Sequence, residues 1–287
     1  MYILDTSALR SIGTDDLIKV KEKVNIGIST ITAFELASHL TRDLTNHEHL
    51  RKRGNFLKGR IPQLLDDPFV LWAQRTSGLV NPHRKEDKIL ILQLFNAVEE
   101  SPTLEELRSK IFYYSDGMKA SFLDIGDMVY RALKKEEENY CSKITPLLSD
   151  SSKLHKVGSK FIITTEVLKA NIVNAIGNKL VDHAPCIRSE ILSHALFTGY
   201  MLHRLYYYAN KMTGSSQLAN QDLNDCEDAY ICLSLNLMAG DVLVTDDNGM
   251  FNAVKETFKQ ICEFLDPPLK QECCVITTKD FLNITRE

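Results

Sequence analysis

The sequence predicts an α/β fold, with a parallel sheet flanked by helices and a large, mainly helical insertion. Three observations predict this class. Short apolar strand signals alternate with helix signals over residues 1–45, the same alternation returns over residues 220–287, and residues 46–219 carry their apolar side chains mainly at helical spacing. We therefore expect both ends of the chain to form one core, and residues 46–219 to pack on that core or to extend it.

The N-terminal segment predicts the order strand, helix, strand, helix. Residues 2–4 are a short apolar run that ends at Asp5, and a mixed helical segment follows to about Lys23. Residues 25–29 predict a second buried strand, and a helix opens at Thr32. This order is typical of the start of a parallel sheet.

The middle of the chain is predicted to be mostly helical, because apolar residues recur there at three- and four-residue spacing. The expected helices are residues 89–99, 104–111, 122–140 and 187–212. Two short stretches, residues 68–72 and 161–165, have the composition of strands.

The C-terminal segment continues the strand and helix alternation of the N-terminal one. Residues 224–238 predict a helix that ends at Gly240. Residues 242–245 form a Val-Leu-Val-Thr run typical of a buried parallel strand, and residues 274–277 form another. We expect these strands to join the sheet that the N-terminal strands begin.

The composition is that of a folded protein. Of 287 residues, 44% are hydrophobic and 25% are charged, which excludes a disordered, collagen-like or disulfide-scaffold chain. No window approaches 18 uninterrupted apolar residues, so we expect no membrane span, and the first residues lack the pattern of a signal peptide. The seven cysteines have no C-x-x-C spacing, which is typical of reduced thiols and predicts a cytoplasmic protein.

Charge is distributed unevenly along the chain. The two ends together hold 10 Lys and Arg against 19 Asp and Glu, whereas residues 46–219 hold 24 against 19. The densest basic cluster lies in the insertion and comprises Arg51, Lys52, Arg53, Lys58 and Arg60, interrupted by Phe56. This cluster is either a solvated helix face or a surface that binds RNA phosphates.

Four acidic residues come from separate segments that a parallel sheet would bring to one edge. Asp5 and Asp247 follow predicted strands, Glu35 lies in the first turn of the helix after the second strand, and Asp228 lies in the helix before residues 242–245. Ligands bind beyond the carboxyl ends of such strands. Clustered carboxylates need a cation, and oxygen ligands suit Mg²⁺ or Mn²⁺. The implied chemistry is phosphodiester hydrolysis.

Four segments of the chain together resemble the PIN-domain family of metal-dependent ribonucleases, and most of all its compact VapC-like toxin nucleases. The segments are MYILDTSALR, ISTITAFELASH, NDCEDAYICLSLNLMAGDVLVTDDNGMF and ECCVITTKDFL. The resemblance covers the two chain ends but not residues 46–219. It implies a PIN-like sheet, an endoribonuclease that depends on Mg²⁺ or Mn²⁺, and an antitoxin partner in a toxin–antitoxin pair. We expect single-stranded or loop RNA as the substrate, because an unpaired backbone can follow a basic groove into a narrow acidic cleft.

The resemblance also assigns roles by position. Asp5 matches the first metal ligand, Glu35 the second acid and Asp228 the third, while Asp247 matches the fourth, with Asp246 as the neighbour that could substitute. The supporting positions are Thr6, Ser7 and Thr245. Asp225, one helical turn before Asp228, is a candidate auxiliary ligand. Gly249-Met250 departs from the family pattern, in which an acid and an aromatic residue are more frequent.

Structural explanations compete with these roles. Glu35 could belong to a capping box with Thr32, and Asp5 and either Asp246 or Asp247 could cap the helices that follow them. For the whole protein, the alternatives are a catalytically silent PIN-like module that binds RNA or a protein, and a DNA nuclease on the same fold. The insertion could select an RNA, recruit a partner or form a homodimer surface. The tyrosines at 206–208 are expected to pack or to stack on bases.

Overall fold

The structure is a computed structural model of the chain. It describes residues 1–42, 63–66, 68, 71, 84–113, 117–150, 154–176, 185–211, 225–265, 269 and 271–284. The chain divides into two compact units, and each is described by itself. The first unit contains residues 1–133, 243–246 and 277–287, and the second contains residues 134–242 and 247–276.

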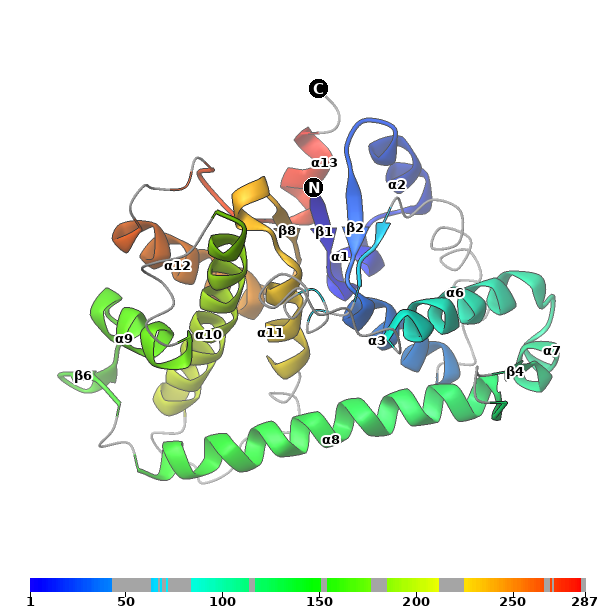
Figure 1. The fold of residues 1–287 in the computed structure, drawn as a ribbon, viewed down its shortest axis with the longest axis horizontal. Helices are drawn as coiled ribbons and strands as arrows, with labels where there is room; N and C mark the ends of the chain where they lie inside the picture. The colour runs from blue at the N-terminus through cyan, green and yellow to red at the C-terminus, as the bar shows by residue number, and fades with distance from the viewer. Residues whose placement is uncertain are drawn as a thin grey trace. The chain divides into compact units, whose positions relative to one another are not determined.

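The first unit is built on a parallel sheet (Figure 1). Strand β1 (Tyr2–Leu4) pairs in parallel with β2 (Ile26–Ile28), and β2 pairs in parallel with β3 (Gln63–Leu64). Strand β8 (Val242–Val244) lies on the other side of β1, so the strand order is β3-β2-β1-β8. All three residues of β2 are buried, as expected for an apolar run inside a parallel sheet. The predicted mixed α/β fold is therefore confirmed.

Helices flank this sheet in the first unit. Helix α1 (Thr6–Ser11) follows β1, α2 (Thr14–Lys21) precedes β2, and α3 (Thr30–Arg42) follows β2. Helix α13 (Thr278–Ile284) carries Phe281, whose ring lies 5.0 Å from the ring of Tyr2 in β1. The predicted alternation over residues 1–45 is thus observed in the first unit, whereas residues 247–276 of the C-terminal alternation belong to the second unit.

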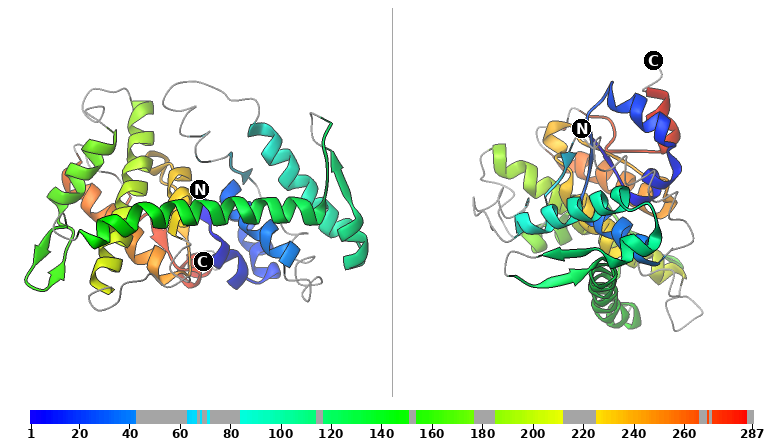
Figure 2. Two further views of the ribbon diagram at one scale, coloured as in Figure 1. Left: turned by 90° about the horizontal axis from the view of Figure 1, so that it is seen from below. Right: turned by 90° about the vertical axis from the view of Figure 1, so that its right-hand side faces the viewer.

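Part of the predicted insertion also belongs to the first unit. It contains α6 (Arg84–Glu100), α7 (Leu104–Ser109), the antiparallel strands β4 (Ile111–Tyr113) and β5 (Lys119–Ser121), and the start of α8 (Phe122–Ser149). Helix α8 is drawn as one continuous helix in the left view of Figure 2. Helix α6 packs against α3, so residues of the predicted insertion contact the predicted core directly.

The second unit is mainly helical. Its long helices are α9 (Thr165–Ile176), α10 (Pro185–Lys211), α11 (Asp225–Ser234) and α12 (Asn248–Phe264). Helix α10 packs against the other three. The unit also contains the hairpin strands β6 (Lys156–Val157) and β7 (Lys160–Phe161), and strand β9 (Val275–Ile276). The helical character predicted for much of the insertion is observed in both units.

Several predicted boundaries need correction. Pro68 and Leu71 are helical, so the strand predicted at residues 68–72 is wrong; the strand of this region is β3. Proline has no N–H for a sheet ladder but is tolerated in the first turn of a helix. Of the strand predicted at residues 161–165, only Phe161 lies in a strand, β7, and α9 begins at Thr165.

Two predicted helices also end earlier than expected. The helix expected over residues 104–111 stops at Ser109, and β4 begins at Ile111. The helix expected over residues 224–238 stops at Ser234 and is followed by the short 3₁₀ helix η5 (Leu237–Ala239). Gly240 ends η5 in a left-handed conformation with φ of 75°, which a glycine adopts without steric cost.

The thiols of the described part of the chain agree with the expectation from the sequence. The six cysteines whose side chains are described are free, and Cys226, Cys232 and Cys274 are buried. None of the described helices combines the length and the apolar character that crossing a membrane requires.

Candidate functional site

Asp5 lies at the carboxyl end of β1, next to the point where the strand order reverses. Strands β2 and β3 lie on one side of β1 and β8 lies on the other, and the amide of Asp5 donates to the carbonyl of Val244 at the end of β8 (3.2 Å). In open α/β sheets this reversal is where ligands bind. The side chain of Asp5 is only 3% exposed.

Three donors hold the Asp5 carboxylate in one orientation. Oδ1 accepts from the backbone amide of Ala8 (2.7 Å), so Asp5 is the N-cap of α1. Oδ2 accepts from the hydroxyl of Thr245 (2.6 Å), and the hydroxyl of Ser7 lies 2.9 Å from both oxygens. The capping explanation for Asp5 is therefore correct, and the same residue also occupies the expected edge of the sheet.

Burial changes the acidity of Asp5. Desolvation raises its pKa from the usual 3.8 to about 6, and the negative charge of Glu35 adds to this rise. The hydrogen bonds from Thr245, Ala8 and Ser7 act in the opposite direction, because they stabilise the carboxylate. Asp5 is thus an acid that a nearby cation would help to ionise.

Glu35 lies in α3 and faces the start of α1. Its Oε2 accepts a 2.5 Å hydrogen bond from the hydroxyl of Thr6. The capping box predicted for Thr32 and Glu35 is wrong, because the helix begins two residues before Thr32 and Ser29 caps it. The Ser29 hydroxyl accepts from the amide of Thr32 (3.0 Å).

The residues after β8 divide between the two units. Thr245 and Asp246 belong to the first unit, and Asp247 belongs to the second. The amide of Asp246 donates to the hydroxyl of Ser7 (2.8 Å), which links the end of β8 to the residue that holds Asp5. Asp247 caps α12 by accepting from the amide of Met250 (2.7 Å).

The Asp246 carboxylate is already engaged within the first unit. It accepts from the hydroxyl of Ser11 (2.6 Å) and from the amide of Thr278 (3.0 Å). Partial burial alone would favour the neutral acid, but these hydrogen bonds outweigh it and lower the pKa of Asp246. Asp246 therefore joins α13 to α1 as an ionised group.

Asp225 and Asp228 lie one turn apart on α11 in the second unit. Asp225 forms an ion pair with Arg204 of α10, with 2.7 Å between Nε and Oδ1. Burial raises the pKa of Asp225, while the positive charge of Arg204 and the hydrogen bond from Tyr208 lower it. Asp228 accepts from the hydroxyl of Tyr200 (3.2 Å). Asp225 is thus paired with a cation of the protein itself.

The predicted site residues therefore form two groups, one in each unit. The first unit brings together Asp5, Thr6, Ser7, Glu35, Thr245 and Asp246, and the second holds Asp225, Asp228 and Asp247. Within the described residues, no three His, Cys, Asp or Glu side chains are grouped closely enough to hold a metal ion.

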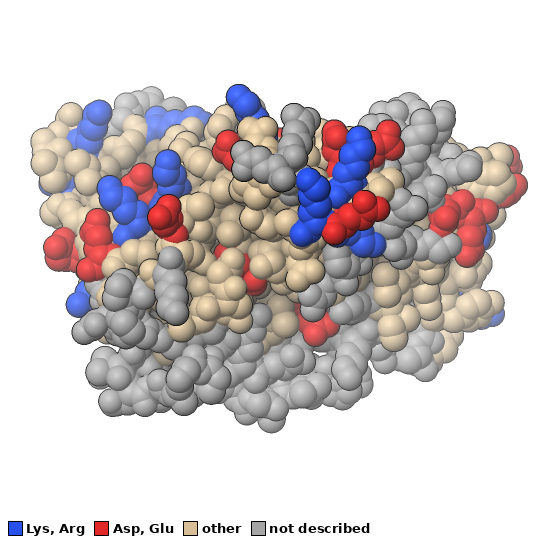
Figure 3. All heavy atoms as spheres, turned by 90° about the horizontal axis from the view of Figure 1, so that it is seen from above, with Lys and Arg blue, Asp and Glu red and all other residues tan. Residues whose placement is uncertain are grey.

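The predicted RNA-binding cluster lies outside the described residues. Its members Arg51, Lys52, Arg53, Lys58 and Arg60 fall in the gap at residues 43–62. On the face drawn in Figure 3, the described Lys and Arg side chains lie beside Asp and Glu side chains rather than in one large area of a single charge.

Sequence reasoning missed Arg204 and did not connect it to Tyr200 and Tyr208. Tyr200 and Tyr208 are fully buried, and the guanidinium of Arg204 donates to the hydroxyl of Tyr208 (3.1 Å). The signal was present, since residues 200, 204 and 208 are four apart and share one face of α10. Their partner on α11 could not be found from this spacing alone.

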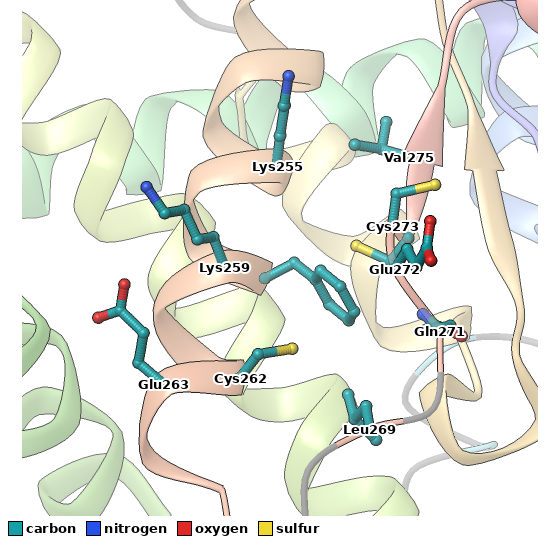
Figure 4. A pocket seen from close by; sticks show the side chains of 11 residues that line it. Lys255, Lys259, Cys262, Glu263, Leu269, Gln271, Glu272, Cys273 and Val275 are labelled. Atoms are coloured by element: carbon teal, nitrogen blue, oxygen red, sulfur yellow. The ribbon is translucent and has the colours of Figure 1, made fainter.

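The second unit also contains a pocket of about 470 Å³ between α12 and the segment that leads to β9 (Figure 4). No predicted site residue lines it. Phe258, Leu269 and Val275 give it apolar walls, and both amide atoms of Gln271 are buried without a hydrogen-bond partner. Glu263 accepts a 2.5 Å hydrogen bond from Thr165.

Comparison of the chain with protein-family models, with curated proteins and with solved structures finds no match.

Proposed function

We propose that this protein is a PIN-like endoribonuclease that hydrolyses RNA phosphodiester bonds with Mg²⁺ or Mn²⁺. One observation carries the proposal. Asp5 is a buried acid at the end of β1 whose carboxylate is bonded to Thr245 at the end of β8, beside the reversal of strand order. Glu35 lies near enough for its charge to raise the pKa of Asp5.

The donor set suits a hard divalent cation. Asp5 and Glu35 offer carboxylate oxygens, which Mg²⁺ and Mn²⁺ prefer. A desolvated acid with a pKa near 6 and a second carboxylate nearby is stabilised by a positive charge. We propose Asp5 and Glu35 as metal ligands, and Asp228, Asp247 and Asp246 stay candidate acids on the strength of the sequence. Such an ion, when bound, activates water and stabilises the charge that develops on the phosphate.

The neighbouring hydroxyl groups keep the acids in fixed orientations. Thr245 and Ser7 donate to Asp5, and Thr6 donates to Glu35. These donors reduce the reorganisation that the carboxylates would otherwise need during a reaction. The buried position of Asp5 also excludes water from its carboxylate, which strengthens its interaction with a cation.

The proposed substrate is single-stranded or loop RNA, because an unpaired strand can enter a narrow acidic site. The basic residues from Arg51 to Arg60 are proposed as a phosphate-binding surface. We further propose that the protein is a cytoplasmic toxin with a protein antitoxin. We also propose that the insertion forms a homodimer surface.

A cleavage assay tests the proposed function. Structured and single-stranded RNAs and matched DNAs are incubated with Mn²⁺, Mg²⁺ or a chelator, and the products are separated by size. The wild type is compared with Asp5→Asn and Asp228→Asn, and with Asp15→Asn, which removes an exposed acid of α2, as a matched control.

We expect RNA cleavage that needs metal, is lost in Asp5→Asn and Asp228→Asn, and is retained in Asp15→Asn. Cleavage of DNA instead of RNA would identify a DNA nuclease. RNA binding without any cleavage would contradict the enzyme and favour a silent binding module.

A further inference from the structure

The pocket of about 470 Å³ beside α12 has the size and the lining of a small-molecule site (Figure 4). Pockets that bind small ligands commonly enclose roughly 300–1,000 Å³ and combine apolar walls with a few polar groups. Phe258, Leu269 and Val275 supply the apolar side chains here, and Gln271 supplies an amide. All of the lining residues belong to the second unit, so the pocket is complete within that unit.

Gln271 carries a donor and an acceptor that the protein leaves unused. Among the described residues, neither Nε2 nor Oε1 of Gln271 has a hydrogen-bond partner, and both atoms are shielded from solvent. Oε1 lies beside Gly240, where an added Cβ would be 3.6 Å away. A buried amide without partners lowers stability, and turning it toward the pocket would break no hydrogen bond. The amide is therefore available to a ligand.

An amide side chain favours a ligand that offers a donor and an acceptor side by side. Glutamine forms such a pair of hydrogen bonds with N6 and N7 of adenine. A nucleobase also has two flat π-faces, which suit a pocket walled by Phe258, Leu269 and Val275. A purely aliphatic ligand would leave the amide of Gln271 unpaired. The lining therefore favours a base over an aliphatic molecule.

The pocket also has charged side chains in its lining. Lys255 and Lys259 line it from α12, one helical turn apart, and Figure 4 shows both ammonium groups pointing away from Gln271. A nucleotide whose base pairs with Gln271 has its phosphate at the other end of the molecule, which suits this placement of the cations. Glu263 and Glu272 balance the two lysines in the lining. We therefore expect the base, rather than the phosphate, to supply most of the affinity.

We propose that this pocket binds an adenine nucleotide, with the base paired to the amide of Gln271 and packed against Phe258, Leu269 and Val275. The inference concerns binding in the second unit and does not depend on the metal-dependent cleavage proposed above. Free adenosine 5′-monophosphate (AMP) and an adenine within single-stranded RNA present the same base. Displacement of AMP by a short oligoadenylate identifies the base in RNA as the ligand, and failure to displace it identifies the free nucleotide.

Isothermal titration calorimetry with AMP, without metal, tests the site. Gln271→Met nearly keeps the size of the side chain but removes the amide. Gln260→Met is the matched control, because the amide of Gln260 donates to the carbonyl of Ile163 (3.2 Å) and does not line the pocket. We expect Gln271→Met to bind AMP at least about tenfold more weakly and to unfold at a higher temperature, because an unpaired amide is removed. Gln260→Met should bind AMP like the wild type and unfold at a lower temperature.

Two results of the titration would overturn the proposal: no binding of AMP by the wild type, and equal binding by the wild type and Gln271→Met. If Gln271→Met does not fold, a second ligand decides with the wild type alone. Purine riboside 5′-monophosphate lacks the exocyclic amino group of AMP and should bind about tenfold more weakly. Equal binding of the two nucleotides would then refute the pairing with Gln271.

Cysteine alkylation locates the bound nucleotide. Cys262 lines the pocket, whereas Cys141 on α8 does not, and both thiols are partly exposed and have a pKa raised by burial. AMP should slow the reaction of Cys262 with N-ethylmaleimide and leave that of Cys141 unchanged, as measured by mass spectrometry of the peptides. An unchanged rate at Cys262 would show that AMP binds elsewhere and would overturn the proposal.

Discussion

The hydroxyl of Thr245 donates a 2.6 Å hydrogen bond to Oδ2 of Asp5, although the two residues are 240 positions apart in the chain. Both are buried, and each follows a strand of the sheet, β8 and β1 respectively. The bond therefore ties the two ends of the chain together at the place where the strand order reverses. The contribution of this bond to stability and its effect on the pKa of Asp5 can be measured.

The first prediction is that the free energy of unfolding depends on pH through the ionisation of Asp5. Burial raises the pKa of Asp5 from 3.8 to about 6, so the folded state binds the proton more tightly than the unfolded state. The preferential protonation of Asp5 in the folded state contributes its full stabilisation below pH 3.8, and this contribution is lost as the pH rises to about 6. The loss is about 3 kcal/mol for a shift of this size.

Urea unfolding between pH 4 and pH 7, without metal, measures this effect. The difference in unfolding free energy between the wild type and Asp5→Asn should fall as the pH rises through this window, because asparagine does not titrate. A difference that stays constant across the window would show that the pKa of Asp5 is not raised.

Replacement of Thr245 by valine should destabilise the protein at pH 7 and raise the pKa of Asp5 further. The variant removes a donor to a buried carboxylate while keeping the shape of the side chain, which costs about 1–3 kcal/mol. Thr257→Val is a matched control, since the hydroxyl of Thr257 is buried without a partner and its loss should cost little or nothing. Equal effects of the two substitutions on the midpoint of urea unfolding would refute the special role of Thr245.

Gly199 allows α10 to approach α12 closely. A Cβ at this position would overlap with Cγ2 of Thr257 and lie 3.1 Å from Cδ1 of Leu168. We expect Gly199→Ala to lower the unfolding free energy by about 1–3 kcal/mol through overpacking. Adding Thr257→Ser removes the overlapping methyl group and should restore part of the loss. Thermal unfolding that is unchanged in Gly199→Ala would contradict this packing.

Ser29 caps α3, so Ser29→Ala should destabilise the protein by about 1 kcal/mol. Glu35→Gln should have a much smaller effect on stability, because Glu35 bonds to Thr6 of α1 and the amide of Thr32 already donates to Ser29. Urea unfolding of the two variants distinguishes this arrangement from the capping box. A larger loss in Glu35→Gln than in Ser29→Ala would favour the capping box.

The sequence predicted the central strands because their signal is local. Three-residue apolar runs such as Tyr2–Leu4 and Val242–Val244 are bounded by polar or turn residues, and burial on both faces of a parallel sheet requires this pattern. Strand β3 could not be predicted in the same way. It has only two residues, one of them Gln63, and it exists because β2 offers a free edge.

The candidate site was predictable in its positions but not in its bonds. The residue type and the place after a strand were enough to select Asp5, whereas its bond to Thr245 depends on strand order across the whole chain. The ion pair of Asp225 could not be predicted for the same reason. Its partner Arg204 comes from a different helix, and no local pattern pairs them.

The most direct test of the central claim is Mn²⁺ binding to the wild type, Asp5→Asn and Asp15→Asn at pH 7, measured by isothermal titration calorimetry. We expect the wild type and Asp15→Asn to bind Mn²⁺ equally and Asp5→Asn to bind it more than about tenfold more weakly, because a carboxylate ligand is lost. Equal binding by the wild type and Asp5→Asn, or no binding by either, would contradict the proposed role of Asp5 as a metal ligand.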